Sequence, residues 1–270
     1  MDEDHFWEPE EPEEEEVEDE YVEEAKPALL KFLDEHREKV FYLKQIQVLF
    51  EKPFFHWVTA RALYGLEDEG LLRSEIRESP KGTRVRLVFH KSHRYRQRQA
   101  DRLLTLIDEM SDPEVAMACG EHADVMFFNA LMGRRFLAYG QDIREYRGRV
   151  WEETAYDLDF IIEKDSVAYG CEVKNKWDYI AREELEVKLR MCEHLGIRPL
   201  FIMRSSPKSY NKLIIDHGGY ALIFVAHIYP FGMRELVGKV REELGLEADS
   251  PRAIPGGIID RFMKWHGKQV

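Results

Sequence analysis

Hydrophobic and polar positions alternate most regularly between residues 156 and 175. The run from Tyr156 to Ile162 alternates acidic or polar with apolar residues, and a second alternating run extends from Tyr169 to Asn175. A polar segment at residues 163–166 separates the two runs and is typical of a turn. Because every second residue of a strand lies on the same face, this pattern predicts a β-hairpin.

The predicted hairpin gathers charged side chains on one face. Glu172 and Lys174 share a face of the second strand, and Asp159 joins them if the faces of the two strands match. Two carboxylates in the middle of a sheet are costly unless a cation or hydrogen bonds offset them. Hard oxygen ligands select Mg²⁺ or Mn²⁺, and a neighbouring lysine can stabilise charge that develops on phosphorus. The alternative is a surface hairpin with solvated charges, which a lone Glu-x-Lys would favour.

The elements around the hairpin alternate between helical and strand patterns. A capping residue, a proline and an acid at residues 111–114 predict the start of a helix. Residues 181–195 and 233–244 have helical spacing, and an amphipathic helix is expected near residue 262. Strands are expected at residues 136–146, 199–203 and 220–225, with a polar loop at 204–210. The pattern predicts an α/β (α+β) domain.

The N-terminal half has a different organisation. Helical patterns cover residues 24–39 and 55–72, and residues 41–50 predict a short helix or a strand followed by a helix. Alternating strands follow at residues 73–77 and 83–90. Three helices followed by a two-stranded hairpin resemble the winged-helix superfamily in outline. A basic run from residue 91 begins a further predicted helix that links the two halves.

Charge is distributed unevenly along the chain. The net charge is -13, but residues 1–25 hold 15 acids and no Lys or Arg. From Lys26 to Arg102 the chain has 17 basic and 10 acidic residues, a net charge of +7. Residues 1–24 are therefore expected to be a disordered acidic tail, which either contacts the basic surface of its own chain or binds a partner protein.

A basic module of this kind is expected to bind nucleic acid. Arg61 lies on the predicted recognition helix, and Lys81 and Arg84 lie at the wing. The remaining candidate contacts lie in the basic run, after the Glu-x-Lys strand and in the polar loop. They are Arg94, Arg96, Arg98, Lys176 and Lys208. Protein–protein contact by the same module, and a solvated face for the basic run, are the alternatives.

At the hairpin the sequence resembles the PD-(D/E)xK nuclease superfamily, in its restriction-endonuclease-like and Holliday-junction-resolvase-like branch. Asp159 matches the metal-binding aspartate, and Glu172-Val173-Lys174 matches the Glu-x-Lys signature. The resemblance covers residues 113–246. It implies a restriction-endonuclease-like fold, with a mixed central sheet flanked by helices, and phosphodiester cleavage with Mg²⁺ or Mn²⁺ as cofactor. The Val173 carbonyl would be a further ligand.

Related nucleases also place an acid on the first helix of this fold. Asp124 is our first choice, since it lies seven residues before Leu131, and Glu121, one turn earlier on nearly the same side, is the alternative. This acid would bind a second ion or orient the first. A solvated or capping role is the simpler reading of either residue.

The sequence thus predicts four parts. They are an acidic tail at 1–24, a winged-helix-like domain at 25–92, a basic linker helix at 93–110 and a nuclease-like domain at 111–270. The expected function is a metal-dependent DNA nuclease. A non-catalytic winged-helix binding or regulatory protein is the alternative, and cleavage of RNA or branched junctions stays open. By analogy with relatives of this core, we also consider a homodimer.

The cellular setting follows from what the sequence contains. The chain has no apolar run of membrane-spanning length and its N-terminus has no secretory h-region, so no membrane contact is expected. Its three cysteines are widely spaced and odd in number. Reduced thiols in a cytoplasmic protein are the simplest interpretation of that spacing.

Overall fold

The computed structural model describes residues 18–270 and divides them into two compact units. The first unit contains the described residues up to Asp112 together with Gly238–Leu246. The second contains Pro113–Val237 and Glu247–Val270. The sequence placed everything after residue 111 in one domain, whereas the structure assigns Gly238–Leu246 to the first unit. Among the described residues, no helix is long and apolar enough to cross a membrane.

The first unit combines helices with a small antiparallel sheet in the order β1-β3-β2. The predicted strand and short helix at 41–50 are both present, as β1 and α2. Apolar residues of α1 and α3, such as Leu29, Leu33 and Leu63, form its core with Ile46 and Val88. The elements are α1 (Glu18–Glu35), β1 (Val40–Tyr42), α2 (Leu43–Leu49), α3 (His56–Asp68), β2 (Leu72–Glu78), β3 (Arg84–His90) and α4 (Gln97–Met110).

Helix α1 begins earlier than the sequence predicted, because it starts at Glu18 rather than near Glu24. Val22, Ala25 and Leu29 are buried and recur at helical spacing, so this turn packs into the core. The last part of the predicted acidic tail is therefore helical. Residues 1–17, and with them the expected contacts of the tail, lie outside the described residues.

Helix α4 begins later than predicted, at Gln97. The segment before it is held against the sheet by side chains instead of entering the helix. The Nη2 atom of Arg96 lies 2.9 Å from Oε2 of Glu75 on β2, and the guanidinium covers the ring of Phe89. The Ser92 amide donates a hydrogen bond to the His90 ring. These local bonds compete with helix formation over residues 91–96.

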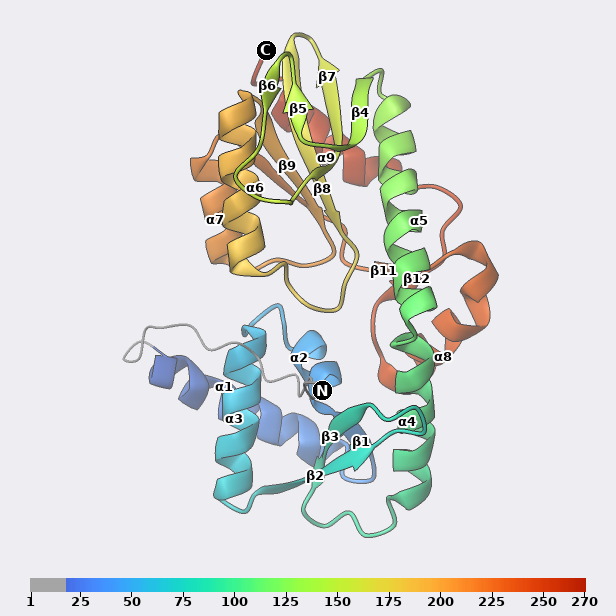
Figure 1. The fold of residues 1–270 in the computed structure, drawn as a ribbon. Coiled ribbons are helices and arrows are strands. Elements are labelled where there is room, and N and C mark those ends of the chain that lie inside the picture. Colours follow the sequence, from blue (N-terminus) through green and yellow to red (C-terminus); the bar gives the residue numbers. More distant parts are fainter. Residues whose placement is uncertain (1–17) are drawn as a thin grey trace. The chain divides into compact units, whose positions relative to one another are not determined.

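The second unit is built on a mixed sheet of five strands, in the order β10-β9-β8-β7-β4 (Figure 1). Strands β4, β7 and β8 pair antiparallel, whereas β8, β9 and β10 pair parallel. The mixed sheet and the α+β class agree with the sequence. The principal elements are α5 (Pro113–Met132), β4 (Leu137–Ile143), β7 (Leu158–Lys164), β8 (Val167–Lys174), α6 (Arg182–Leu195), β9 (Arg198–Met203), α7 (Lys208–Asp216), β10 (Tyr220–Ile223) and α9 (Gly256–His266).

Shorter elements complete the chain. Strands β5 (Glu145–Tyr146) and β6 (Arg149–Val150) form a small hairpin, and β11 (His227–Ile228) pairs with β12 (Ala248–Asp249). A single 3₁₀ turn, η1 (Phe231–Met233), leads into α8 (Arg234–Leu244).

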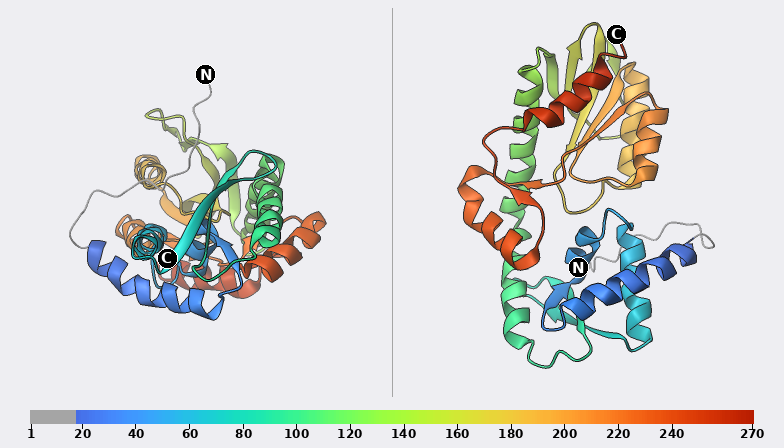
Figure 2. Two further views of the ribbon diagram at one scale, coloured as in Figure 1. Left: turned by 90° about the horizontal axis from the view of Figure 1, so that it is seen from below. Right: turned by 180° about the vertical axis from the view of Figure 1, so that it is seen from behind.

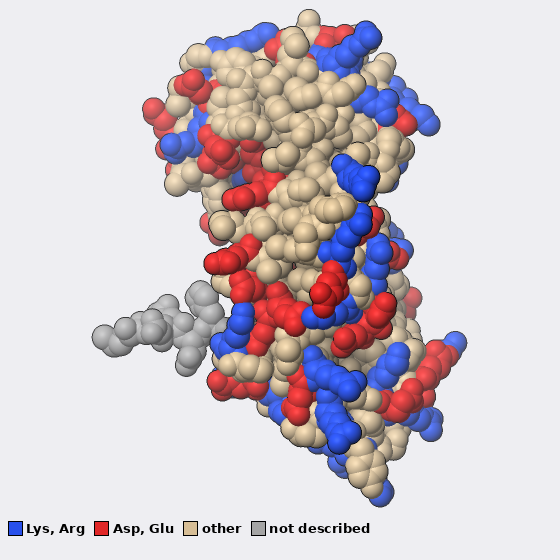
Figure 3. Space-filling model, turned by 90° about the vertical axis from the view of Figure 1, so that its right-hand side faces the viewer, with Lys and Arg blue, Asp and Glu red and all other residues tan. Residues whose placement is uncertain are grey.

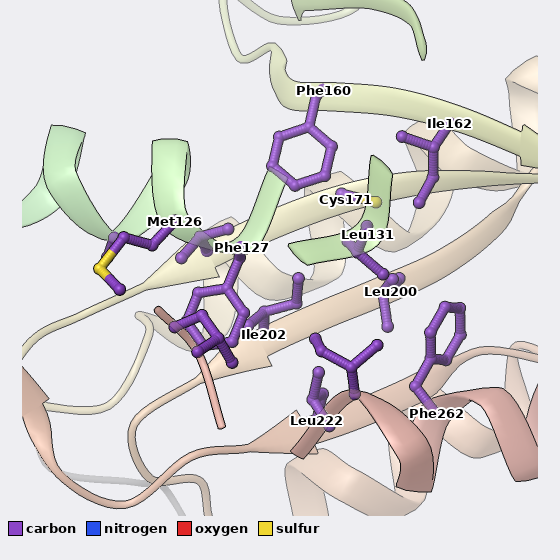
Figure 4. Close-up of a cluster of buried hydrophobic side chains, with 14 of the residues drawn as sticks. Met126, Phe127, Leu131, Phe160, Ile162, Cys171, Leu200, Ile202, Leu222 and Phe262 are labelled. Carbon is purple, nitrogen blue, oxygen red and sulfur yellow. The ribbon is translucent and has the colours of Figure 1, made fainter. Parts of the chain in front are cut away.

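Helices cover both faces of the large sheet (Figures 1 and 2). Helices α5 and α9 pack on one face, where Phe127 and Phe262 meet Phe160 and Leu200 in the main apolar cluster (Figure 4). Helix α6 packs on the other face, where its Cys192 joins a second cluster with apolar residues of β7. The site described below is therefore enclosed between a sheet face and a helix.

Helix α7 was not predicted. Its first residues, Lys208 to Tyr210, fell within the predicted polar loop at 204–210, and no element was predicted for the rest of the helix. Ile214 is buried, and Tyr210 and Leu213 pack partly buried against the same apolar cluster. Helix α6 by contrast ends as expected, at Gly196, whose φ of 72° is left-handed.

Candidate active site

The β7–β8 hairpin closes with a two-residue turn, within the polar segment that the sequence indicated. Asp165 and Ser166 have φ values of 51° and 64°. Positive φ at both central positions is the geometry of a type I′ turn, which matches the twist of the flanking strands. The turn fixes the pairing register, and with it the face on which each side chain lies.

The register brings the two predicted carboxylates together. Phe160 lies opposite Cys171, and the next position in this register sets Asp159 opposite Glu172 on the other face. Phe160, Cys171 and Val173 all belong to the apolar cluster beneath α5. The charged face and the apolar face of the hairpin are thus divided as the alternation predicted.

Asp159 is fixed by the neighbouring strand. Its Oδ2 accepts a hydrogen bond of 2.6 Å from the Val173 amide. Burial raises the pKa of Asp159 to about 6, although the Val173 bond and the nearby lysines act in the opposite direction. Repulsion from Asp124 contributes to the rise. An added cation would therefore stabilise the ionised form of this carboxyl group.

Glu172 is the most buried member of the site, with no exposed surface. Lys174 Nζ lies 2.6 Å from its Oε1, and Lys188 Nζ donates a hydrogen bond to its Oε2. Burial and then repulsion from Asp159 raise the pKa of Glu172 to about 7, against the effect of both lysines. Despite its ion pair with Lys174, Oε1 accepts no hydrogen bond of ordinary geometry.

Lys174 is held from two sides. Besides Glu172 it contacts Glu184 of α6, with Nζ 2.8 Å from Oε1. Burial alone would lower the pKa of Lys174, but the two carboxylates outweigh it and the pKa is raised. The same contact lowers the pKa of Glu184, although burial acts to raise it. Lys174 is thus a fixed ammonium group and not a proton donor near neutral pH.

The two helix acids behave differently. Asp124 is partly buried, and its pKa is raised to about 6, first by burial and next by repulsion from Glu172, while Lys174 lowers it. Asp124 is therefore within electrostatic reach of the hairpin residues. Glu121 is exposed and acts on Asp124 only as a weak further repulsion. The structure brings Asp124, and not Glu121, to the candidate site.

The donors suit a hard cation in type and charge. No group of three or more His, Cys, Asp or Glu side chains among the described residues converges into a closed metal cluster. Mg²⁺ does not require one, since it commonly binds through one or two carboxylates and keeps several waters. Asp159 and Oε1 of Glu172, which lies beside Lys174, are two such donors. Val173 contributes its amide to Asp159, and its carbonyl remains a predicted ligand.

Lys188 was not identified from the sequence. It lies on α6 with only 4 % of its side chain exposed and contacts Glu172. Its position in the helix could have identified it, because residue 188 falls on the apolar face that Leu185, Leu189 and Cys192 define. A lysine on such a face needs a buried partner.

Two further buried polar residues fix the chain where it leaves β8. Asn175 donates to the carbonyl of Ile228 at 2.6 Å and accepts from its amide at 2.9 Å. Arg204 donates to the carbonyl of Lys176 at 2.7 Å. These bonds anchor the segment that follows Lys174. Lys176 is itself exposed and close enough to lower the pKa of Glu184, and its contact with nucleic acid stays a prediction.

The other predicted nucleic-acid contacts are distributed over both units. In the first unit, Arg61 covers the Trp57 ring, Lys81 pairs with Asp112, and Arg96 is tied to the sheet. Lys81 is exposed despite this pair, as are Arg84, Arg94, Arg98 and, at the start of α7, Lys208. In the view of Figure 3 basic and acidic side chains are interspersed. The structure does not connect Lys208 with the hairpin residues.

The comparisons do not assign a class. No family model matches the sequence, and no curated protein or solved structure matches the chain. The class of protein therefore depends on the mixed sheet and on the site itself.

The raised pKa values predict how stability changes with pH. Asp124, Asp159 and Glu172 bind more protons in the folded than in the unfolded protein between about pH 4 and their folded pKa values of about 6, 6 and 7. The free energy of unfolding should therefore fall as pH rises from 5 to 7.5, by up to about 1.4 kcal/mol per pH unit for each carboxyl. Urea denaturation across this range measures the slope. A slope unchanged in Asp159→Asn would contradict this assignment.

Proposed function

We propose that the protein is a metal-dependent nuclease with a restriction-endonuclease-like core of the PD-(D/E)xK type. The observation that supports this most strongly is the arrangement of Asp159, Glu172 and Lys174 on adjacent strands. Both carboxyl groups are buried or partly buried with raised pKa values, and Glu172 Oε1 lies 2.6 Å from Lys174 Nζ. Such perturbed groups cluster at functional sites.

The residues have distinct roles in the proposed reaction. Asp159 and Glu172 would hold Mg²⁺ or Mn²⁺, with the Val173 carbonyl beside them, and Asp124 would bind a second ion or orient the first. When bound, the cation supplies Lewis acidity to a phosphodiester oxygen. Lys174 places a fixed positive charge where negative charge develops on phosphorus and orients the attacking water. The buried, preorganised positions of these groups support hydrolysis of phosphodiester bonds.

The first unit supports binding of the nucleic acid. Its order of helix, strand, two helices and a two-stranded hairpin is that of a winged helix, with α3 as the recognition helix and the β2–β3 turn as the wing. We propose DNA as its ligand because the region from Lys26 to Arg102 has a net charge of +7.

The exposed basic residues before and within α4 make a measurable prediction. Changing both Arg94 and Arg98 to Ala should make the dependence of log K on log salt less steep by about two, since each phosphate contact contributes about 0.9. Fluorescence anisotropy with duplex DNA from 50 to 200 mM salt measures the slope. Lys31 on α1 and Arg37 in the turn that follows it, changed to Ala together, are the control. Equal slopes in the wild type and the Arg94/Arg98 variant would exclude this contact.

A cleavage panel tests the proposed function. The purified protein would be incubated with Mg²⁺ or Mn²⁺ and labelled single-stranded, duplex, flap and four-way-junction DNA, and with RNA. Metal-dependent cutting is expected, and the substrate that is cut fastest defines the class. Binding without cutting of any substrate would exclude the nuclease and leave the alternative, a winged-helix DNA-binding protein with a silent nuclease-like unit.

A further inference from the structure

The charged groups of the site continue from the hairpin onto α6. Lys174 contacts Glu172 at 2.6 Å and Glu184 at 2.8 Å. Lys188 contacts Glu172 and lies 3.8 Å from the same Glu184 oxygen. Two acids and two lysines therefore alternate in a closed ring of four ion pairs, which we call the ion-pair ring. Its formal charge is zero, so each of these charged groups has an oppositely charged partner before any cation enters.

The two lysines hold different oxygens of Glu172. Lys188 holds Oε2 and its side chain is 4 % exposed, whereas Lys174 lies beside Oε1 and is 16 % exposed. Oε1 is thus on the more accessible side, and it is also the oxygen that accepts no hydrogen bond of ordinary geometry. A cation that arrives from solvent would engage Oε1 and displace Lys174 from it.

If a cation displaces Lys174 from Glu172, Lys174 needs another carboxylate partner, which the hairpin alone does not provide. With the cation bound to Oε1 of Glu172, Lys174 would lose its first ion-pair partner and would lie close to a divalent ion. Glu184 supplies the second partner, because it already contacts Lys174 and lies on a different element. Lys188 meanwhile keeps Oε2 of Glu172 in place.

We propose that α6 is part of the active site, with Glu184 and Lys188 as positioning residues. Glu184 retains Lys174 when Glu172 turns to the cation, and Lys188 anchors Glu172 so that Oε1 is the oxygen offered. This inference rests on the proposed function, since it concerns the same cation. It extends the site from the Asp and Glu-x-Lys residues to a pair four residues apart on a helix.

The experiment observes the lysines directly. Protein labelled with ¹³C and ¹⁵N in lysine gives ammonium signals for buried, ion-paired Nζ groups, which Lys174→Met and Lys188→Met assign. In the wild type, saturating Mg²⁺ should shift both signals and leave both sharp. In Glu184→Gln, the Lys174 signal should be sharp without Mg²⁺ and broaden or vanish when Mg²⁺ is added. Glu186→Gln, a matched change at a more exposed position of α6, should behave like the wild type.

Kinetics supply a second readout. Glu184→Gln should lower kcat by about 10–100-fold, the effect typical of residues that orient the groups around a metal. The KM for nucleic acid should stay within about twofold, because Glu184 is not proposed to touch the substrate. If the role of Glu184 were purely structural, Glu184→Gln would lower the midpoint of thermal unfolding, and Mg²⁺ would not broaden the Lys174 signal.

The outcomes separate this inference from the proposed function. If Mg²⁺ shifts the lysine signals but Lys174 stays equally sharp in Glu184→Gln, the positioning role is wrong and the metal site stands. Loss of the Lys174 signal in the wild type on adding Mg²⁺ would lead to the same conclusion. If no lysine signal responds to Mg²⁺ in the folded protein, the cation does not bind there and both proposals are overturned.

Discussion

Asp159→Asn should reduce metal-dependent cleavage on the order of 10³-fold while the protein stays folded. The amide keeps an oxygen that can accept the hydrogen bond from Val173, so the hairpin retains its geometry. The charge that would hold the cation is lost, and removal of one electrostatic stabiliser of a transition state has an effect of about this size. Single-turnover cleavage of the preferred substrate, measured with saturating Mg²⁺, gives the ratio.

The expected stability of the Asp159→Asn variant separates a loss of catalysis from a loss of folding. Burial raises the pKa of Asp159, so its charge is unfavourable in the folded protein near pH 7.5. The Asn variant should therefore be at least as stable as the wild type while it is inactive. Asp157→Asn, two residues earlier and outside β7, is the matched control and should cleave normally. Cleavage by Asp159→Asn within tenfold of the wild type would refute the assigned site.

Lys188→Met should lower the free energy of unfolding of the second unit by about 3 kcal/mol. Breaking a buried ion pair by removing one partner typically costs about 3–5 kcal/mol. The lower end is expected because Glu172 keeps Lys174, and because a pKa of about 7 allows Glu172 to take up a proton once Lys188 is gone. Urea denaturation measures this loss when two transitions are fitted, one for each unit.

Two further variants test whether the loss comes from this pair. Arg190→Met removes an exposed cation from the same helix and should change stability by less than about 0.5 kcal/mol. Glu172→Gln combined with Lys188→Met should show an interaction energy of at least about 1 kcal/mol. Additive losses would mean that the contact between Lys188 and Glu172 contributes little to stability.

Local periodicity was sufficient to predict the hairpin and its three charged residues. Alternation places Asp159, Glu172 and Lys174 on one face whatever the rest of the fold, provided that the turn sets the register. The type I′ turn does so with only Asp165 and Ser166. The α+β class was predictable for a related reason, since alternation and helical spacing distinguish most of its strands from its helices.

The remaining features depend on contacts distant in sequence. Periodicity identifies Lys188 only as a misplaced lysine, and its partner Glu172 lies on a strand 16 residues earlier. The choice between Asp124 and Glu121 depends on how α5 is rotated against the sheet, which three-residue and four-residue spacing does not resolve. The late start of α4 depends on Arg96 bonding to β2. In each case tertiary contacts override a local preference.

The assignment of Gly238–Leu246 to the first unit has a practical consequence for dissecting the protein. The chain leaves the second unit at residue 237 and returns to it at 247. Val240, Leu244 and Leu246 are buried, and the Leu244 carbonyl accepts a hydrogen bond from Gln45. A fragment covering residues 113–270 would therefore display an apolar segment whose partners have been cut away. Joining residue 237 to residue 247 through a short Gly-Ser linker would yield a cleaner excised nuclease-like unit.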